Sequence, residues 1–390
     1  MIVGLTGNEA VAQAVKQCNV DLVAAYPITP STVVVEKISE YVANGEINTE
    51  FICVESEHSA MSACIGASLA GARVFTATSS QGLAYMHEML YITSGLRCPV
   101  VMSVANRALS APINIHCDHS DAFGSRDCGW IQLWAEDVQE TYDCIFEAFR
   151  IAESPEVTLP TMVCYDGFII SHALERVNLL SDDDVKRFLP GREAAYTLNP
   201  KKPITVGALV LPDYYFEIKR QQEEALRASI ATIRTTKEEF KKVSGREHAI
   251  IQSYMMEDAE SAVICLGSTA GQARVAVDEL RKEGKKVGVL KLHLYRPFPA
   301  REVVKALRGL KVLAVLDRAY SPGAVGGPLF SDVCAAMYGI RDGPYIFDVA
   351  YGLGGRDIST ADFRKIFDKS FDVLRAGRVD EPLIQVGVRE

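Results

Sequence analysis

A proline-rich turn near the start of the sequence presents a hydroxyl group. The segment Tyr26-Pro27-Ile28-Thr29-Pro30 follows a short apolar stretch, residues 21–26, that is typical of a buried strand. Because prolines restrict the backbone on both sides of Thr29, its hydroxyl would be held in a fixed direction. In doubly wound sheets, ligands bind at this end of the strands. The spacing alone favours a plainer alternative, a stiff connector whose threonine faces solvent.

A glutamate stands in the first turn of the next predicted helix. Ser56 can cap this helix, and the helix dipole favours a carboxylate at Glu57, so these effects alone would explain the residue. The predicted helix, residues 57–70, also carries small residues that allow close packing: Ala60, Ala63, Gly66, Ala67 and Ala70. Such packing, in a core or a subunit interface, would partly desolvate Glu57 and raise its proton affinity. Acid–base chemistry uses that condition.

An arginine follows a third predicted strand. Arg107 comes just after residues 99–104 and is therefore expected at the same sheet edge as the other two residues. A guanidinium there can bind a carboxylate through two parallel hydrogen bonds. The alternative is a surface ion pair, which an isolated arginine favours.

Two further polar segments give weaker signals. Residues 116–121 hold two histidines, two aspartates and a cysteine, but no further set of metal ligands is evident in the sequence. We therefore expect a polar active-site loop there, and no metal ligand in this chain. Gly267-Ser268-Thr269-Ala270-Gly271 follows a strand and can hold an anion at a helix start, although it lacks the dinucleotide fingerprint.

The elements that must position these residues form a regular pattern. Strands of five or six residues alternate with helices of twelve or more, which predicts an α/β fold with parallel sheets covered on both faces. The rhythm breaks over an arm, residues 181–250, that ends in a long charged helix and attaches to the first domain. We therefore predict two doubly wound parallel-sheet domains, over residues 1–180 and 251–390.

Composition narrows the class of protein. The 390 residues are 48% hydrophobic and 23% charged, as in soluble globular proteins. The net charge of −9, without a basic stripe, argues against nucleic-acid binding. We find no signal peptide and no apolar run of membrane-spanning length, so we expect a cytoplasmic protein. Ten cysteines without a Cys-x-x-Cys motif predict reduced thiols, and place any redox metal on another chain.

Several short blocks match one known enzyme family. They are Gly7-Asn8-Glu9-Ala10, Tyr26-Pro27-Ile28-Thr29-Pro30-Ser31-Thr32, Glu55-Ser56-Glu57-His58-Ser59-Ala60, Thr78-Ser79-Ser80-Gln81-Gly82-Leu83, Asn106-Arg107-Ala108-Leu109, Asp118-His119-Ser120-Asp121, Leu294-Tyr295-Arg296-Pro297-Phe298-Pro299, Asp317-Arg318 and Ser321-Pro322-Gly323. The sequence thereby resembles the alpha chain of the pyruvate:ferredoxin oxidoreductases, within the 2-oxoacid:ferredoxin oxidoreductase family. The resemblance covers nearly the whole length, and the arm contributes least to it.

The resemblance implies a fold and a reaction. The fold would be a pyrimidine-binding thiamine diphosphate domain followed by a transketolase C-terminal-like domain. The reaction would be CoA-dependent oxidative decarboxylation of pyruvate to acetyl-CoA with electrons passing to ferredoxin, or the reverse. By this resemblance, Glu57 bonds the aminopyrimidine of the cofactor, beside Pro27 and Ile28, and Thr29 and Arg107 hold the carboxylate of the 2-oxoacid.

One part of such a site is missing from the sequence. Thiamine enzymes bind magnesium and the diphosphate through a Gly-Asp-Gly segment, and the nearest matches here, residues 341–343 and 166–167, lack the first glycine. The resemblance therefore implies a beta subunit with that motif and an iron–sulfur cluster, together with gamma and ferredoxin-like delta subunits. Branched-chain 2-oxoacids or 2-oxoglutarate are alternative substrates. A non-catalytic scaffold subunit is a further alternative, against which Glu57, Thr29 and Arg107 argue.

Overall fold

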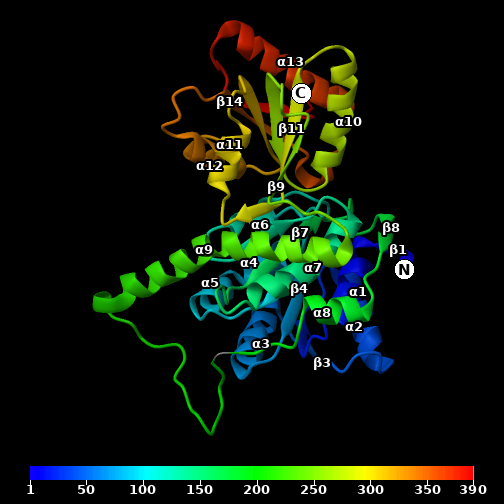
Figure 1. The fold of residues 1–390 in the computed structure, drawn as a ribbon, viewed down its shortest axis with the longest axis vertical. Helices are drawn as coiled ribbons and strands as arrows, with labels where there is room; N and C mark the ends of the chain where they lie inside the picture. The colour runs from blue at the N-terminus through cyan, green and yellow to red at the C-terminus, as the bar shows by residue number, and fades with distance from the viewer. Residues whose placement is uncertain (195, 390) are drawn as a thin grey trace.

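The structure, a computed structural model, describes residues 1–194 and 196–389. It contains two α/β units, one above the other, and a long helix, α9 (Pro212–Ser244), that lies across the first unit (Figure 1). Each unit is built on its own sheet, and both sheets are mainly parallel. The predicted fold class is confirmed, with one antiparallel edge strand added to each sheet.

The first sheet has seven strands in the order β12-β6-β7-β5-β4-β2-β3. In chain order these are β2 (Leu22–Ala25), β3 (Glu50–Cys53), β4 (Val74–Thr78), β5 (Val101–Asn106), β6 (Ile131–Trp134), β7 (Thr161–Asp166) and β12 (Leu294–Arg296). Its helices are α1 (Gly7–Gln17), α2 (Thr32–Ala43), α3 (Glu57–Ala70), α4 (Ser80–Tyr85), α5 (His87–Gly95), α6 (Ser120–Gly124) and α7 (Val138–Ala152). A separate antiparallel ribbon, β1 (Ile2–Thr6) with β8 (Leu174–Asn178), and α8 (Asp182–Phe188) complete this part.

The second sheet has six strands in the order β15-β14-β13-β10-β11-β9. Its strands are β9 (Ile251–Tyr254), β10 (Ser261–Cys265), β11 (Val287–Leu292), β13 (Val312–Asp317), β14 (Tyr345–Tyr351) and β15 (Leu383–Val386). Its helices are α10 (Thr269–Lys282), α11 (Ala300–Ala306), α12 (Pro328–Met337) and α13 (Thr360–Ala376), with a 3₁₀ turn at Leu353–Gly355. The domain limits that the sequence suggests, near 180 and 250, stay predictions.

Local sequence explains the elements that frame the sheet edge. Strands β4, β5 and β7 are buried along their whole length, because helices cover both faces of a parallel sheet. Helix α3 begins where the Ser56 hydroxyl accepts the Ser59 N–H, and ends at Gly71, whose φ of 104° suits glycine. The helical segment after β4 is divided in two, because the buried Met86 leaves helical geometry (φ −88°, ψ 10°) and separates α4 from α5.

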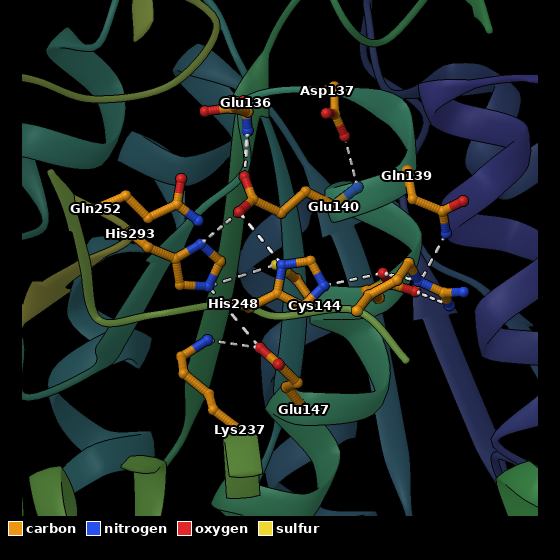
Figure 2. A network of polar contacts seen from close by, with 12 residues as sticks. Glu136, Asp137, Gln139, Glu140, Cys144, Glu147, Lys237, His248, Gln252 and His293 are labelled. Atoms are coloured by element: carbon orange, nitrogen blue, oxygen red, sulfur yellow. Dashed lines mark hydrogen bonds and ion pairs between the residues drawn. The ribbon is translucent and has the colours of Figure 1, made fainter. Parts of the chain in front are cut away.

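The two units meet at a buried ionic network (Figure 2). Glu140 of α7 accepts hydrogen bonds from Lys291 of β11, at 2.8 and 2.7 Å, and contacts His293 at 3.1 Å. About two turns further along α7, Glu147 accepts a hydrogen bond from Lys237 of α9 at 2.7 Å. Buried charges of opposite sign thus connect the first unit, the long helix and the second unit.

The arm before α9 departs from the compact part of the chain. The N-terminal half of α9 projects beyond the first unit (Figure 1), and Tyr214, Tyr215 and Phe216 on it are exposed. Although α9 has 33 residues, none of the described helices combines the length and the apolar character needed to cross a membrane. All ten cysteines are free, as the sequence predicts.

Candidate active site

The three residues singled out in the sequence lie at one edge of the first sheet. Thr29, Glu57 and Arg107 follow β2, β3 and β5, which run parallel with β4 between β5 and β2. The carboxyl ends of these strands therefore meet at a common edge, as expected for a ligand site in a doubly wound sheet. Their functional roles stay predictions, but their common location follows from the fold.

Glu57 is a buried carboxylate at the start of α3. Its residue is 6% exposed, and burial raises its pKa above the ordinary value. Within the described chain, its carboxylate forms no hydrogen bond to another residue. The group is thus partly desolvated, as the sequence predicts, and its oxygen atoms stay available to a ligand.

A glycine on α4 makes room for this carboxylate. A Cβ at Gly82 would lie 2.6 Å from Glu57 Oε1 and 2.4 Å from the Thr78 hydroxyl. Such distances are too short for any side chain, so position 82 requires glycine for this close approach. The buried Thr78 hydroxyl has no hydrogen-bond partner among the described residues. The carboxylate of Glu57 and this hydroxyl therefore converge on Gly82.

Arg107 is a buried cation without a carboxylate partner. It is 6% exposed, and burial lowers the pKa of its guanidinium. Nε donates to the carbonyl of Asn114 and Nη1 to the carbonyl of Thr29, each at 2.9 Å. In the described part of the chain, Nη2 donates to no residue and the guanidinium forms no ion pair. The positive charge is therefore oriented but not neutralised.

The structure brings Thr29 and Arg107 into direct contact. The contact uses the carbonyl of Thr29, so its exposed hydroxyl is free of hydrogen bonds to the described residues. Pro27 is exposed and Ile28 half-buried on the same turn. The turn thus presents a hydroxyl and an apolar surface beside the guanidinium.

Asp121, in the expected polar loop, is a further residue of this site, although no individual role was predicted for it. Its buried carboxylate accepts the backbone N–H groups of Ser80 at 2.9 Å, Arg107 at 3.0 Å and Ala122 at 2.7 Å, and the amide of Asn106 at 2.8 Å. Burial raises the pKa of Asp121 to about 6, although these four donors oppose the shift. Asp121 thereby ties the start of α4, next to Glu57, to the end of β5, which carries Arg107.

The loop of histidines and aspartates does not form a free metal site. His116 is exposed, whereas the buried His119 lies 2.8 Å from Asp166. Cys117, His119 and Asp166 come within metal-binding distance of one another, but the Arg318 guanidinium donates to Asp166 at 3.2 Å. A cationic side chain already compensates the charge of this carboxylate, which weakens it as a metal ligand. The expectation of a polar active-site loop without a metal stays a prediction.

The predicted anion site at residues 267–271 is occupied by a carboxylate of the chain itself. Asp166, at the end of β7, accepts the backbone N–H of Ser268 at 3.2 Å, and the Ser268 hydroxyl also bonds to it. Burial would raise the pKa of Asp166, but His119 and Arg318 outweigh it and hold the pKa below its ordinary value. The start of α10 therefore receives its anion from the first unit.

Neither near match to a Gly-Asp-Gly segment provides a diphosphate site. Asp166 is engaged by His119, Arg318 and Ser268. The other match, residues 341–343, lies on an exposed turn of the second unit, after α12.

Solved structures support the fold. A chain of the 2-oxoglutarate:ferredoxin oxidoreductase from Magnetococcus marinus superposes with a TM-score of 0.73 over 95% of this chain and 65% of that chain, at 19% identity. A split-gene transketolase superposes with a TM-score of 0.55 over 95% of this chain and 99% of that chain, at 14% identity. The fold that the resemblance implies is thus confirmed.

Sequence comparisons identify the family. The chain is 49% identical to a pyruvate synthase subunit PorA of Thermotoga maritima, over 100% of this chain and 98% of the relative. It is 46% identical to the subunit of that name from Methanocaldococcus jannaschii (99% and 98%), and 43% identical to a ketoisovalerate oxidoreductase subunit VorA of Pyrococcus horikoshii (97% and 96%). Residues 13–238 match the family described as "Pyruvate flavodoxin/ferredoxin oxidoreductase, thiamine diP-bdg", and residues 259–363 match "Pyruvate:ferredoxin oxidoreductase core domain II". The chain therefore belongs to the pyruvate:ferredoxin oxidoreductase family.

Proposed function

We propose that this chain is the alpha subunit of a cytoplasmic pyruvate:ferredoxin oxidoreductase. The complex would convert pyruvate and CoA to acetyl-CoA and carbon dioxide, with electrons passing to ferredoxin, or run the reverse reaction. The observation that carries the proposal is the buried guanidinium of Arg107, which pairs with no described acidic side chain and contacts the carbonyl of Thr29. A buried cation without an acid partner favours an anionic ligand, and a 2-oxoacid supplies a carboxylate.

The site fits the aminopyrimidine of thiamine diphosphate. Gly82 leaves space against Glu57, and burial raises the pKa of this carboxyl group, so it can share a proton with a ring nitrogen. Pro27 and Ile28 would supply apolar contacts. When bound, the cofactor supplies the electron sink for decarboxylation. Glu57 would hold and return the proton that this chemistry moves.

The substrate carboxylate would bind between Arg107 and Thr29. Nη2 of Arg107 and the Thr29 hydroxyl are two donors that form no hydrogen bond to the described residues, and together they suit one carboxylate. A single cation favours a monocarboxylate such as pyruvate over a dicarboxylate. The 43% identity to a ketoisovalerate oxidoreductase subunit keeps a branched-chain 2-oxoacid as the second candidate.

Partner subunits would complete the site. A beta subunit would bring the diphosphate and magnesium site with an iron–sulfur cluster, and gamma and delta subunits would bring CoA contacts and further clusters. The outer surface of α3, α4 and α5 is suited to a partner: Tyr85 on α4 and Tyr91 on α5 are 61% and 44% exposed. Gly66 and Ala70 on α3 are also exposed and allow close approach of another backbone.

One experiment tests the substrate directly. The native complex is purified, and reduction of a low-potential dye is measured with CoA and pyruvate, 3-methyl-2-oxobutanoate or 2-oxoglutarate. We expect pyruvate to give the highest kcat/KM. Preference for the branched acid would favour the second candidate, and no activity with any 2-oxoacid would leave the scaffold alternative.

A further inference from the structure

The guanidinium of Arg107 is oriented by two backbone carbonyls of different character. Thr29, which accepts from Nη1 at 2.9 Å, is followed by Pro30 in a stiff turn. Asn114, which accepts from Nε at 2.9 Å, lies in an irregular loop over residues 107–119 whose middle is mostly exposed. The direction of the guanidinium therefore depends on what holds this loop in place.

The second unit supplies that support through the turn at residues 352–355. Asn114 Nδ2 donates to the Gly354 carbonyl at 3.1 Å, and the Gly355 N–H donates to the Cys117 carbonyl at 2.6 Å. Gly354 has a φ of +60°, and a Cβ there would lie 2.4 Å from Asn114 Nδ2. The positive φ favours glycine, and the turn packs directly against the Asn114 side chain.

The anchors of Arg107 leave its charge for a ligand. Carbonyl groups accept hydrogen bonds but do not neutralise a guanidinium. From Arg107, the nearby carboxylate of Asp121 accepts only the backbone N–H, at 3.0 Å, and no side-chain N–H. An aspartate at the place of the Asn114 carbonyl would have satisfied the same N–H and cancelled the charge. The two carbonyl groups therefore orient the guanidinium of Arg107 without neutralising its charge.

We propose that Asn114 is a positioning residue for the substrate carboxylate, and that the second unit sets its place through Gly354. The inference rests on the proposed role of Arg107. Without the contact to Gly354, the Asn114 carbonyl can move and the planar fork can rotate out of line with the carboxylate. The carboxylate is lost only in the decarboxylation step, so a weaker hold on it acts first on substrate binding and raises KM with little effect on kcat.

The test is Asn114→Ala in the assembled complex. We expect KM for pyruvate to rise roughly threefold to tenfold, the scale of one neutral hydrogen bond, at nearly unchanged kcat, thiamine content and Tm. The matched control is Asn199→Ala. The side-chain oxygen of Asn114 accepts the backbone N–H of His116 at 2.7 Å. Asn199, on the exposed arm, makes the same local contact, because its side-chain oxygen accepts the N–H of Lys201 at 2.9 Å. KM should not change in this control.

A second variant approaches the contact from the other side. Gly354→Ala places a methyl group against Asn114 Nδ2 and should raise KM in the same way. In the Arg107→Lys background, Asn114→Ala should add much less than it does alone, because both changes act on one guanidinium.

The outcomes separate this inference from the proposed function. A normal kcat/KM for pyruvate in Arg107→Lys would overturn the proposed binding of the substrate carboxylate by Arg107. A lowered value in Arg107→Lys, with unchanged KM in Asn114→Ala and Gly354→Ala, would overturn only the positioning role. Additive effects in the double variant, or loss of thiamine or of assembly in both loop variants, would overturn it as well, because either result assigns the contact to general structure.

Discussion

The carboxyl group of Glu57 lies where its protonation can be shared with a ligand, because burial raises its pKa and no described residue bonds it. We predict that Glu57→Gln in the assembled enzyme lowers turnover roughly a hundredfold or more, the scale of general acid–base assistance. Glutamine keeps the volume, and the helix cap at Ser56 persists, so folding should change little. Dye-reduction kinetics and thermal unfolding measure the two effects; wild-type turnover, or collapse of the complex, would contradict the assignment.

Arg107 and Thr29 should differ in what each contributes to the substrate carboxylate. Arg107→Lys keeps a charge but loses the planar fork, so kcat/KM for pyruvate should fall on the order of ten- to a hundredfold, about 1.4 to 2.7 kcal/mol. Thr29→Val removes one neutral hydrogen bond and should cost about 0.5 to 1.5 kcal/mol. Thiamine content should stay normal in both, since each is assigned to substrate; quantifying it alongside the kinetics checks this, and loss of thiamine in Arg107→Lys would refute the clamp.

Single residues of the candidate site could be predicted from the sequence where their neighbours in the chain indicate their position. Thr29, Glu57 and Arg107 each follow a strand, and that position alone places them on one edge. The roles of Asn114 and Asp121 could not be predicted, because their contacts join segments far apart in the chain, such as Asn114 with Gly354. Asp121 stood within a matched block, but nothing local indicates that its carboxylate collects donors from both α4 and β5.

The start of α4 depends on one glycine. We predict that Gly82→Ala forces α4 away from Glu57, because its Cβ would lie 2.6 Å from Oε1. The expected result is a loss of about 1 to 3 kcal/mol of stability, as for other overpacked sites, and reduced thiamine content in the complex. Chemical unfolding and thiamine assay measure these.

Gly271→Ala on α10 serves as the matched control for that change. Gly271 is exposed, and a Cβ there meets nothing within 4 Å. Alanine should therefore be neutral or slightly stabilising in this helix. Equal behaviour of the two variants would mean that the space at Gly82 has no special role.

Helices and strands could be predicted from the sequence where their own residues determine the secondary structure. The parallel strands are buried on both faces and carry a continuous apolar signal, which explains why the fold class emerged from the sequence. The break at Met86 and the pairing of β12 with β6 depend on tertiary packing, and neither has a local signature. The exposed first half of α9 likewise looks like any charged amphipathic helix in the sequence.

The junction between the units should respond to alkaline pH. Burial opposes a charge on His248, but its hydrogen bonds to Asp143 and Glu140 raise its pKa from 6.5 to about 10. A raised folded pKa stabilises the protein fully below about 6.5, and this contribution is lost as the pH rises towards about 10. Arg246, Lys237 and Glu147 complete the charges around it.

We therefore predict that the Tm difference between wild type and His248→Gln is largest below pH 6.5 and shrinks steadily above it. Calorimetric scans of the complex over this range measure it. His58→Gln, at a half-exposed histidine 3.5 Å from Glu88, should show a small difference throughout. A difference for His248→Gln that grows with pH would show that the protonated form of His248 does not stabilise the folded state.

The whole chain should be insufficient for cofactor binding by itself. Because the diphosphate and magnesium site is expected on a partner, we predict that the isolated chain is inactive and binds thiamine diphosphate only weakly. Calorimetric titration with magnesium present checks this. Binding at micromolar or tighter dissociation constants would show that the chain holds a diphosphate site of its own.

The carboxylate of Asp166 at the start of α10 affects which dissolved anions can bind at this point of the second unit. A dissolved phosphate would have to displace an anion carried by the same chain, and such a tethered group acts at an effective concentration on the order of millimolar. Arg318, which also contacts Asp166, gives the internal anion a further advantage. The internal carboxylate therefore puts a dissolved phosphate group at a disadvantage at the start of α10, where Asp166 already accepts the Ser268 N–H.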